Sequence, residues 1–212
     1  MSVLRLPKLP AATGKQHWGN LPGAALSLAI AEAASAAKRF TLLLTADSQS
    51  AERLQEELAF FAPELPVLHF PDWETLPYDV FSPHQDIISQ RIAALYRLPQ
   101  LKHGVLVVPI STALHRLAPT RFLLGSGLVL DVGQKLDVEE MRARLEAAGY
   151  RCVDTVYEHG EFAVRGALID LFPMGSDTPF RIDLFDDEIE TLRTFDPETQ
   201  RSVDKVESIR LL

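Results

Sequence analysis

The pattern of apolar residues changes near residue 125, and this change constrains the fold more than any other feature of the chain. Before it, continuous apolar runs at residues 40–47 and 103–110 alternate with stretches of helical periodicity such as residues 48–61. Strands that alternate with helices predict a parallel sheet, and continuous apolar runs predict strands covered on both faces. After residue 125, a helix over about residues 138–148 is followed by several strands with hairpin signals. We therefore expect an α/β protein: a parallel-sheet domain at residues 1–125, then a smaller α+β domain at residues 126–212 with a mainly antiparallel sheet.

Three groups of residues match the capping patterns that are typical of helix N-termini. Ser82, Pro83 and Gln85 follow the order of an N-cap, a first-turn proline and a capping-box residue, which predicts a helix from there to about residue 98. Ser111 is expected to cap a short helix that ends near residue 117. Asp137, with a glutamate three residues later, forms a second capping-box pattern.

Charge separates the two halves and bears on the kind of partner. Residues 1–125 carry 11 basic and 10 acidic side chains, whereas residues 126–212 carry 10 basic and 19 acidic, so the net charges are +1 and −9 within a total of −8. Because nucleic-acid affinity comes largely from clustered Lys and Arg, the second half favours a protein partner over DNA.

Cysteine usage and hydropathy indicate a cytoplasmic protein. Cys152 is the single cysteine, which excludes an intramolecular disulfide and fits a reducing compartment. The alanine-rich segment from Ala24 to Ala37 is shorter than the roughly 20 residues that a membrane-spanning helix needs. We expect no membrane contact, no metal centre and no cofactor.

The segment FRIDLF at residues 180–185 gives the strongest functional signal. In a strand, Phe180, Ile182 and Leu184 would point to one face, and Arg181, Asp183 and Phe185 to the other. A cation, an anion and an aromatic ring facing outward together are typical of a protein-docking surface.

Arg165 has two interpretations that the sequence leaves open. It precedes Gly166 in a strand, where a glycine lets another backbone approach closely. In one interpretation, Arg165 forms a rim salt bridge with a nearby carboxylate, which stabilises the protein by at most about 1 kcal/mol if it is exposed. In the other, it is an interface anchor, whose truncation costs roughly 2 kcal/mol or more of binding free energy.

Two patterns invite an enzymatic interpretation, and both are weak. Gly14-Lys15 and Gly23 stand before a helix, but Ala24 and Ala25 follow Gly23, so the glycine, lysine and hydroxyl spacing of a phosphate loop is missing. The acidic residues around Asp186 and Asp187 suggest a Mg²⁺ site, but a tight turn between two strands explains them more simply. A residual nucleotide hydrolase or a metal-dependent nuclease remains the alternative function.

Three long motifs resemble a known family. GEFAVRGALIDLFP (160–173) and FRIDLFDDEIETLRTFDPETQ (180–200) resemble the second domain of the excision-repair helicase UvrB and, more closely, that of the transcription-repair coupling factors, the Mfd family. DWETLPYDVFSPHQDIISQR (72–91) is similar to the first domain of the same family. The resemblance spans nearly the whole chain and implies a RecA/helicase-like first domain without a working phosphate loop.

The resemblance also implies a function and a site. In this family the second domain docks UvrA, the damage-recognition ATPase of nucleotide excision repair. The motif positions fall on Arg165, Arg181, Asp183 and Phe185, so we expect these four to contact UvrA. The chain would then be a non-catalytic N-terminal module that recruits UvrA to a stalled RNA polymerase.

The rest of the parent protein would supply what this chain lacks. The resemblance implies that RNA polymerase and DNA binding, together with ATP and Mg²⁺, belong to a translocase part outside this chain. It also leaves open an intramolecular contact, in which the docking surface packs on the translocase part until UvrA is needed.

Overall fold

The computed structural model describes residues 9, 14–76, 80–121 and 127–211, which form two compact units. The first unit comprises residues 1–72 and 97–117, and the second comprises residues 73–96 and 118–212, as far as they are described. Residues 73–96 therefore associate with the second unit, although part of the first unit follows them in sequence. A domain boundary near residue 125 stays a proposal.

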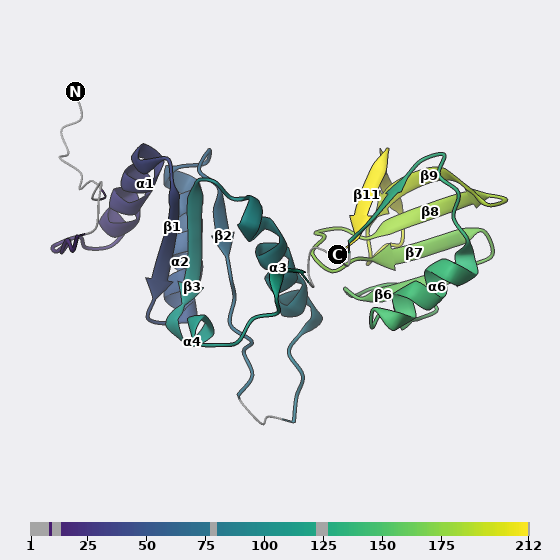
Figure 1. Ribbon diagram of the computed structural model, residues 1–212, viewed down its shortest axis with the longest axis horizontal. Helices are drawn as coiled ribbons and strands as arrows, with labels where there is room; N and C mark the ends of the chain where they lie inside the picture. The colour runs from purple at the N-terminus through teal and green to yellow at the C-terminus, as the bar shows by residue number, and fades with distance from the viewer. Residues whose placement is uncertain (1–8, 10–13, 77–79, 122–126, 212) are drawn as a thin grey trace. The chain divides into compact units, whose positions relative to one another are not determined.

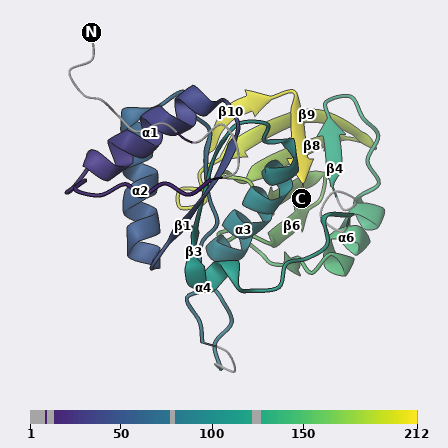
Figure 2. The same ribbon diagram turned by 60° about the vertical axis from the view of Figure 1, so that its left-hand side comes forward.

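The first unit is a three-stranded parallel sheet with two helices on one face. Its strands, in sheet order, are β1 (Phe40–Thr45), β3 (Gly104–Pro109) and β2 (Val67–His69). Helices α1 (Ala25–Ala37) and α2 (Ser48–Phe61) lie side by side and pack on Val105 and Val107 of the central strand (Figures 1 and 2). The parallel α/β architecture predicted for this half is confirmed.

Strand β1 differs from the expectation of coverage on both faces. Phe40, Leu42 and Leu44 are 39, 52 and 48% exposed, whereas every residue of β3 is buried. The reason is that α1 and α2 pack on the face to which Leu43 belongs, whereas the three exposed side chains alternate with Leu43 and lie on the other face. A continuous apolar run therefore predicted a strand correctly, but the prediction that both of its faces are covered was wrong.

Two helix starts also differ from the sequence prediction. Helix α3 (Gln85–Arg97) begins at Gln85 rather than at Pro83, and the ring Nδ1 of His84 accepts a hydrogen bond from the Asp86 N–H at 3.3 Å. Helix α4 (Ile110–Ala113) stops before residue 117, and a short 3₁₀ turn, η1 (Leu98–Gln100), follows α3. Ser111 lies within α4 and donates to a carboxylate instead of capping the helix.

The second unit is built on a six-stranded sheet. In sheet order its strands are β10 (Ser202–Val206), β9 (Glu188–Phe195), β8 (Phe180–Phe185), β7 (Leu168–Phe172), β6 (Glu161–Arg165) and β5 (Arg151–Cys152). Neighbours are antiparallel except β5 and β6, and a separate antiparallel pair joins β4 (Leu128–Asp131) to β11 (Ser208–Leu211). The expectation of a mainly antiparallel second half is confirmed.

The main core of this unit lies on one face of the six-stranded sheet. Helix α6 (Val138–Ala147) contributes Met141 and Leu145, and the Asp137 carboxylate caps it by accepting from the Glu140 N–H at 3.0 Å, as predicted. The sheet contributes Phe162, Ile169, Leu171, Ile182, Leu184, Ile189 and Leu192. The opposite face carries a smaller cluster made of Val156, Ala163, Phe172 and Phe195.

Helix α3 is fastened to the second unit at both ends. Near its start, Asp86 bonds His159 at 2.8 Å and Ser89 accepts from the Gly175 N–H at 2.8 Å. Near its end, Arg210 donates to the Tyr96 hydroxyl at 2.9 Å. None of the helices within the described residues is long and apolar enough to cross a membrane.

Candidate docking site

Strand β8 places the predicted residues on the sheet face opposite the α6 core. Ile182 and Leu184 point into that core, whereas Arg181, Asp183 and Phe185 alternate with them and point away. The register extends this face to β6, where Arg165 lies on the same side as Leu168 and Asp183. We call Arg165, Arg181, Asp183 and Phe185, with the sheet surface between them, the docking face.

A buried carboxylate on the intervening strand joins the two arginines of the docking face. Asp170 of β7 is 1% exposed, and its Oδ1 and Oδ2 accept from Arg181 Nε and Nη2 at 2.7 and 2.9 Å. Its Oδ2 also accepts from Arg165 Nη2. The hydrogen bonds to Asp170 raise the pKa of Arg181 above its ordinary value. Because a buried carboxylate is costly unless it is paired, Asp170 requires these arginines.

The two arginines differ in exposure. The Arg181 side chain is 14% exposed, lies over the Phe195 ring at 4.8 Å and donates from Nη1 to the Gln200 carbonyl at 3.2 Å. The Arg165 side chain is 47% exposed. Arg181 is therefore less available to a partner than the simple strand alternation predicts, while about half of the Arg165 side chain remains exposed.

Asp183 is held by residues of the neighbouring strand β9. Its Oδ2 accepts from Thr191 Oγ1 at 2.7 Å and pairs with Arg193 Nη2 at 3.2 Å. The Asp183 side chain remains 27% exposed. The carboxylate is thus fixed in orientation while part of it faces solvent.

Phe185 stands on a braced hairpin. The residue is 70% exposed, and the β8–β9 turn follows it at Asp186, whose φ is 53°. Lys135 bonds Asp187 at 2.7 Å across this turn, and the Leu136 N–H donates to the Asp187 carbonyl at 2.7 Å. An exposed ring on a fixed support is suited to insertion into an apolar pocket of a partner.

Sequence reasoning missed three residues of this arrangement, namely Asp170, Thr191 and Arg193. A signal existed for Asp170, because a charged residue in the middle of the apolar segment LIDLF must be paired if the strand is buried. The expected role of Gly166 was wrong: its φ is 64° and a Cβ added there would meet no atom within 4 Å, so it serves the two-residue β6–β7 turn rather than a close backbone approach.

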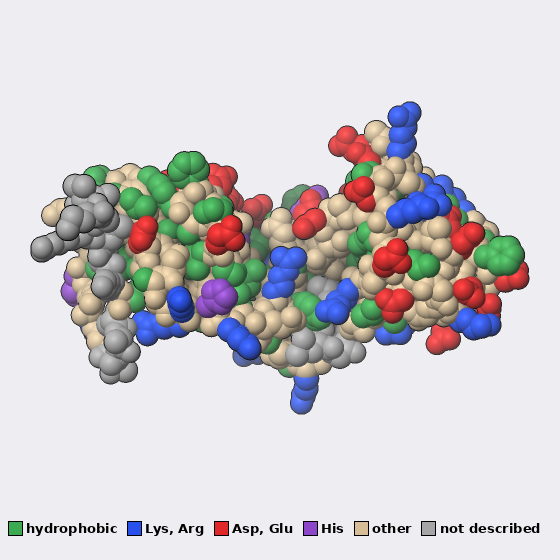
Figure 3. Space-filling model, turned by 90° about the horizontal axis from the view of Figure 1, so that it is seen from above, with side chains coloured by type: hydrophobic (Ala, Val, Ile, Leu, Met, Phe, Trp, Pro, Cys, Tyr) green, Lys and Arg blue, Asp and Glu red, His purple; other side chains and the backbone are tan. Residues whose placement is uncertain are grey.

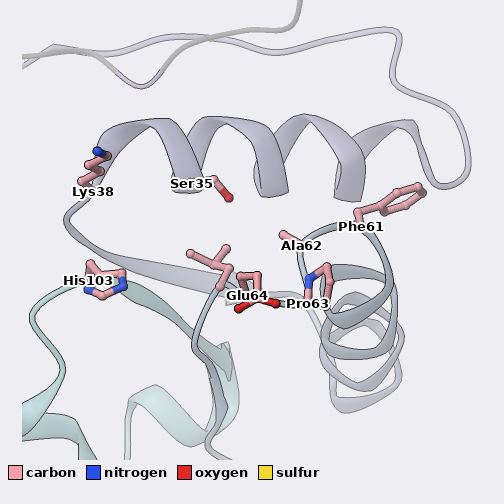
Figure 4. A pocket seen from close by; sticks show the side chains of 8 residues that line it. Ser35, Lys38, Phe61, Ala62, Pro63, Glu64 and His103 are labelled. Atoms are coloured by element: carbon pink, nitrogen blue, oxygen red, sulfur yellow. The ribbon is translucent and has the colours of Figure 1, made fainter.

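The strands of the first unit have hydrogen-bonded polar side chains at their carboxyl ends. Parallel sheets bind ligands at the carboxyl ends of their strands, where Asp72 accepts from Ser111 and Thr112 at 2.5 and 2.9 Å. A pocket of this unit, lined by residues including Lys38, Glu64 and His103, lies instead at the amino ends of β1 and β3 (Figure 4).

The acidic turn shows the ordinary partners of a structural hairpin. Asp187 pairs with Lys135, which lowers the pKa of the Asp187 carboxyl, mainly through the hydrogen bond from the ammonium. Glu188 and Glu190 are exposed, as predicted. Among the described residues, His, Cys, Asp and Glu side chains form no group of three that could hold a metal ion.

Comparison with known proteins places this geometry in a family. The family described as "UvrB interaction domain" matches residues 128–212, which include the whole docking face. The chain is 50% identical over 205 residues to the transcription-repair-coupling factor of Escherichia coli, and 52% identical over 194 residues to that of Haemophilus influenzae. The chain belongs with the N-terminal region of the transcription-repair-coupling factors.

The match to these coupling factors covers the chain but only part of each relative. It includes 96 and 92% of this chain, yet 18 and 17% of the two relatives. A more distant coupling factor, from Staphylococcus aureus, is 33% identical over 191 residues. The chain thus spans about a fifth of the length of the coupling factors that it matches, and it contains a UvrB-like interaction domain.

Proposed function

We propose that this chain is a non-catalytic adaptor module that docks UvrA through the docking face and so recruits nucleotide excision repair to stalled RNA polymerase. Membership of the UvrB-like interaction family supports a protein-docking role for residues 128–212. The four expected contact residues, Arg165, Arg181, Asp183 and Phe185, lie on one face of one sheet, as a single interface requires.

The observation that carries the proposal is the exposure of Arg165 and Phe185 beside charged side chains that are paired within the sheet. Arg165 is 47% and Phe185 70% exposed, although the remaining charges of the docking face are paired within the sheet. Arginines and aromatic rings are the residue types that most often dominate interface energies. Arg165 would supply charged hydrogen bonds to UvrA, and Phe185 the apolar anchor.

Charge supports a protein partner over nucleic acid. On the face of the second unit that Figure 3 shows, basic and acidic side chains are interspersed rather than gathered into a basic patch. Residues 126–212 carry 10 basic and 19 acidic side chains, which opposes binding to phosphate backbones.

Other functions of the coupling factors belong, in this proposal, to the remainder of the parent protein. These are the contacts with RNA polymerase and DNA, and the ATP- and Mg²⁺-dependent translocation. We place the protein in the cytoplasm, where these partners act. If the docking face packs on the translocase part, the full-length protein will bind UvrA more weakly than this chain does.

Binding measurements with matched variants test the proposal. Purified UvrA is titrated against the wild-type chain, Arg165→Ala and Phe185→Ala, and each variant should lose roughly thirtyfold in affinity, equivalent to about 2 kcal/mol. Arg142→Ala is the control for Arg165, since Arg142 is also 47% exposed and also pairs with one carboxylate. Phe60→Ala is the control for Phe185, because Phe60 is 80% exposed in the first unit.

Circular dichroism establishes that each variant is folded before titration. The controls should bind UvrA like the wild-type chain. Wild-type affinity in folded Arg165→Ala and Phe185→Ala would show that UvrA docks elsewhere or not at all.

A further inference from the structure

The sheet brings three charged side chains from three different strands to one spot on the docking face. Asp170 of β7 lies opposite Arg181 of β8 and opposite Ala163 of β6. Arg165 is two residues beyond Ala163 on the same face, so it reaches Asp170 diagonally. Asp170 is therefore the group that links an arginine on β6 to an arginine on β8.

The hydrogen bonds of the two guanidinium groups show a division of roles. Arg181 uses Nε and Nη2 for Asp170 and Nη1 for the Gln200 carbonyl, and its flat face lies on Phe195. Within the described residues, Arg165 bonds Asp170 through Nη2, and its side chain is 47% exposed. Arg181 is thus held in place by its contacts within the sheet, whereas Arg165 is held by one hydrogen bond and can donate further hydrogen bonds to a partner.

The charges explain why the arrangement depends on Asp170. Two guanidinium groups share one carboxylate, so the group keeps a net positive charge that is exposed at Arg165. Without the carboxylate, two like charges would face each other, and Arg165 would be released to sample many rotamers. A partner would then have to order that side chain on binding, which lowers affinity.

We infer that Asp170 is a positioning residue of the docking face, which holds Arg165 in the conformation that the partner recognises while making no contact with the partner itself. The carboxylate is 1% exposed, so it is covered before any partner arrives. The inference rests on the proposed function, because it assigns a cause to the geometry of that same face. The partner chemistry it fits is a carboxylate placed to receive the outward N–H groups of Arg165.

The test compares two buried carboxylates on this sheet. Asp170→Asn keeps the side-chain shape but removes the charge, and it should weaken UvrA binding by roughly tenfold or more, which corresponds to about 1.4 kcal/mol. The control is Glu161→Gln: Glu161 of β6 has a side chain that is 9% exposed and accepts from Arg151 at 3.0 Å and from the Tyr157 N–H at 2.9 Å. It is four residues from Arg165, about 13 Å along the strand, so Glu161→Gln should bind like the wild type.

A spectroscopic measurement separates positioning from a loss of stability. In ¹⁵N spectra of the free wild-type chain, the Arg165 guanidinium, which bonds Asp170 through Nη2, should show slowed rotation, and this slowing should be lost in Asp170→Asn but kept in Glu161→Gln. This wild-type measurement also decides the case if Asp170→Asn does not fold. A freely averaged Arg165 side chain in the free wild-type chain would overturn the inference.

The binding outcomes distinguish this inference from the proposed function. Wild-type affinity in folded Asp170→Asn, or equal losses in Asp170→Asn and Glu161→Gln, would overturn the inference alone. If the wild-type chain does not bind UvrA, the proposed function fails and the inference fails with it.

Discussion

Arg165 and Arg181 bond the same carboxylate, yet we predict that truncating them affects stability very differently. Arg181→Ala removes two hydrogen bonds to Asp170, one to the Gln200 carbonyl and the cation over Phe195. Arg165→Ala removes one hydrogen bond from a side chain that is 47% exposed, and Asp170 keeps both bonds to Arg181. The same face therefore contains one structural and one replaceable arginine.

The magnitudes follow from burial. Removing one partner of a buried ion pair costs about 3–5 kcal/mol, because the other charge is left uncompensated. In Arg181→Ala the remaining bond from Arg165 offsets part of that cost, so we expect a loss of about 3 kcal/mol in the free energy of unfolding of the second unit. For Arg165→Ala we expect at most about 1 kcal/mol, since solvent screens its exposed charge. A domain is stable by only about 5–15 kcal/mol, so the first loss is large and the second is small.

Urea unfolding followed by far-ultraviolet circular dichroism measures both values on the same chain. The comparison includes the wild type, Arg165→Ala, Arg181→Ala and the control Arg142→Ala at about 25 °C and neutral pH. The slopes of the free energy of unfolding against urea concentration should agree if the unfolded states are alike. Equal losses for the two arginines, or a larger loss for Arg165→Ala, would refute the division into support and contact. The prediction also implies that weak UvrA binding by Arg181→Ala must be corrected for the unfolded fraction.

Two further predictions concern the first unit. Burial lowers the pKa of His69, so the unfolded chain binds the proton more readily and the free energy of unfolding falls as pH drops below about 6.5. His69→Gln should reduce this pH dependence in urea unfolding between about pH 7 and pH 5, and an unchanged dependence would contradict the assignment. Gly104 has φ of 128°, and a Cβ there would lie 2.4 Å from the Pro66 carbonyl oxygen, so Gly104→Ala should lower the free energy of unfolding by roughly 3 kcal/mol or more. Thermal unfolding measures this loss, and the control Gly19→Ala, where a Cβ meets no atom within 4 Å, should have wild-type stability.

Local patterns were sufficient for most of the secondary structure. The helix at Ser48–Phe61 has the bounds that its periodicity predicts, because Asp47 caps it from the adjacent residue. The alternation in residues 180–185 is also observed, since a strand with one face on a core fixes which side chains point inward. In both cases the deciding interactions join residues that are close in sequence or that share one strand.

The features that the sequence did not reveal depend on distant contacts. Exposure of one face of β1 arises because α1 and α2 pack on the opposite face, and the apolar run of β1 does not encode which face the helices cover. The start of α3 was predicted from Ser82 and Pro83, but the helix is held by His159 and Gly175, more than 70 residues later. The partial burial of Arg181 required the position of Asp170 on the adjacent strand.

The sequence by itself determined the order of helices and strands, the two kinds of sheet and the set of side chains that β8 turns away from its core. These properties depend on 3.6-residue and two-residue periods, which act over one or two turns or one strand. Tertiary structure decided which of those side chains are free to meet a partner. That choice arises where β6, β7 and β8 lie side by side, because one carboxylate buried on the middle strand holds Arg181 in a largely buried position and bonds Arg165, whose side chain remains about half exposed.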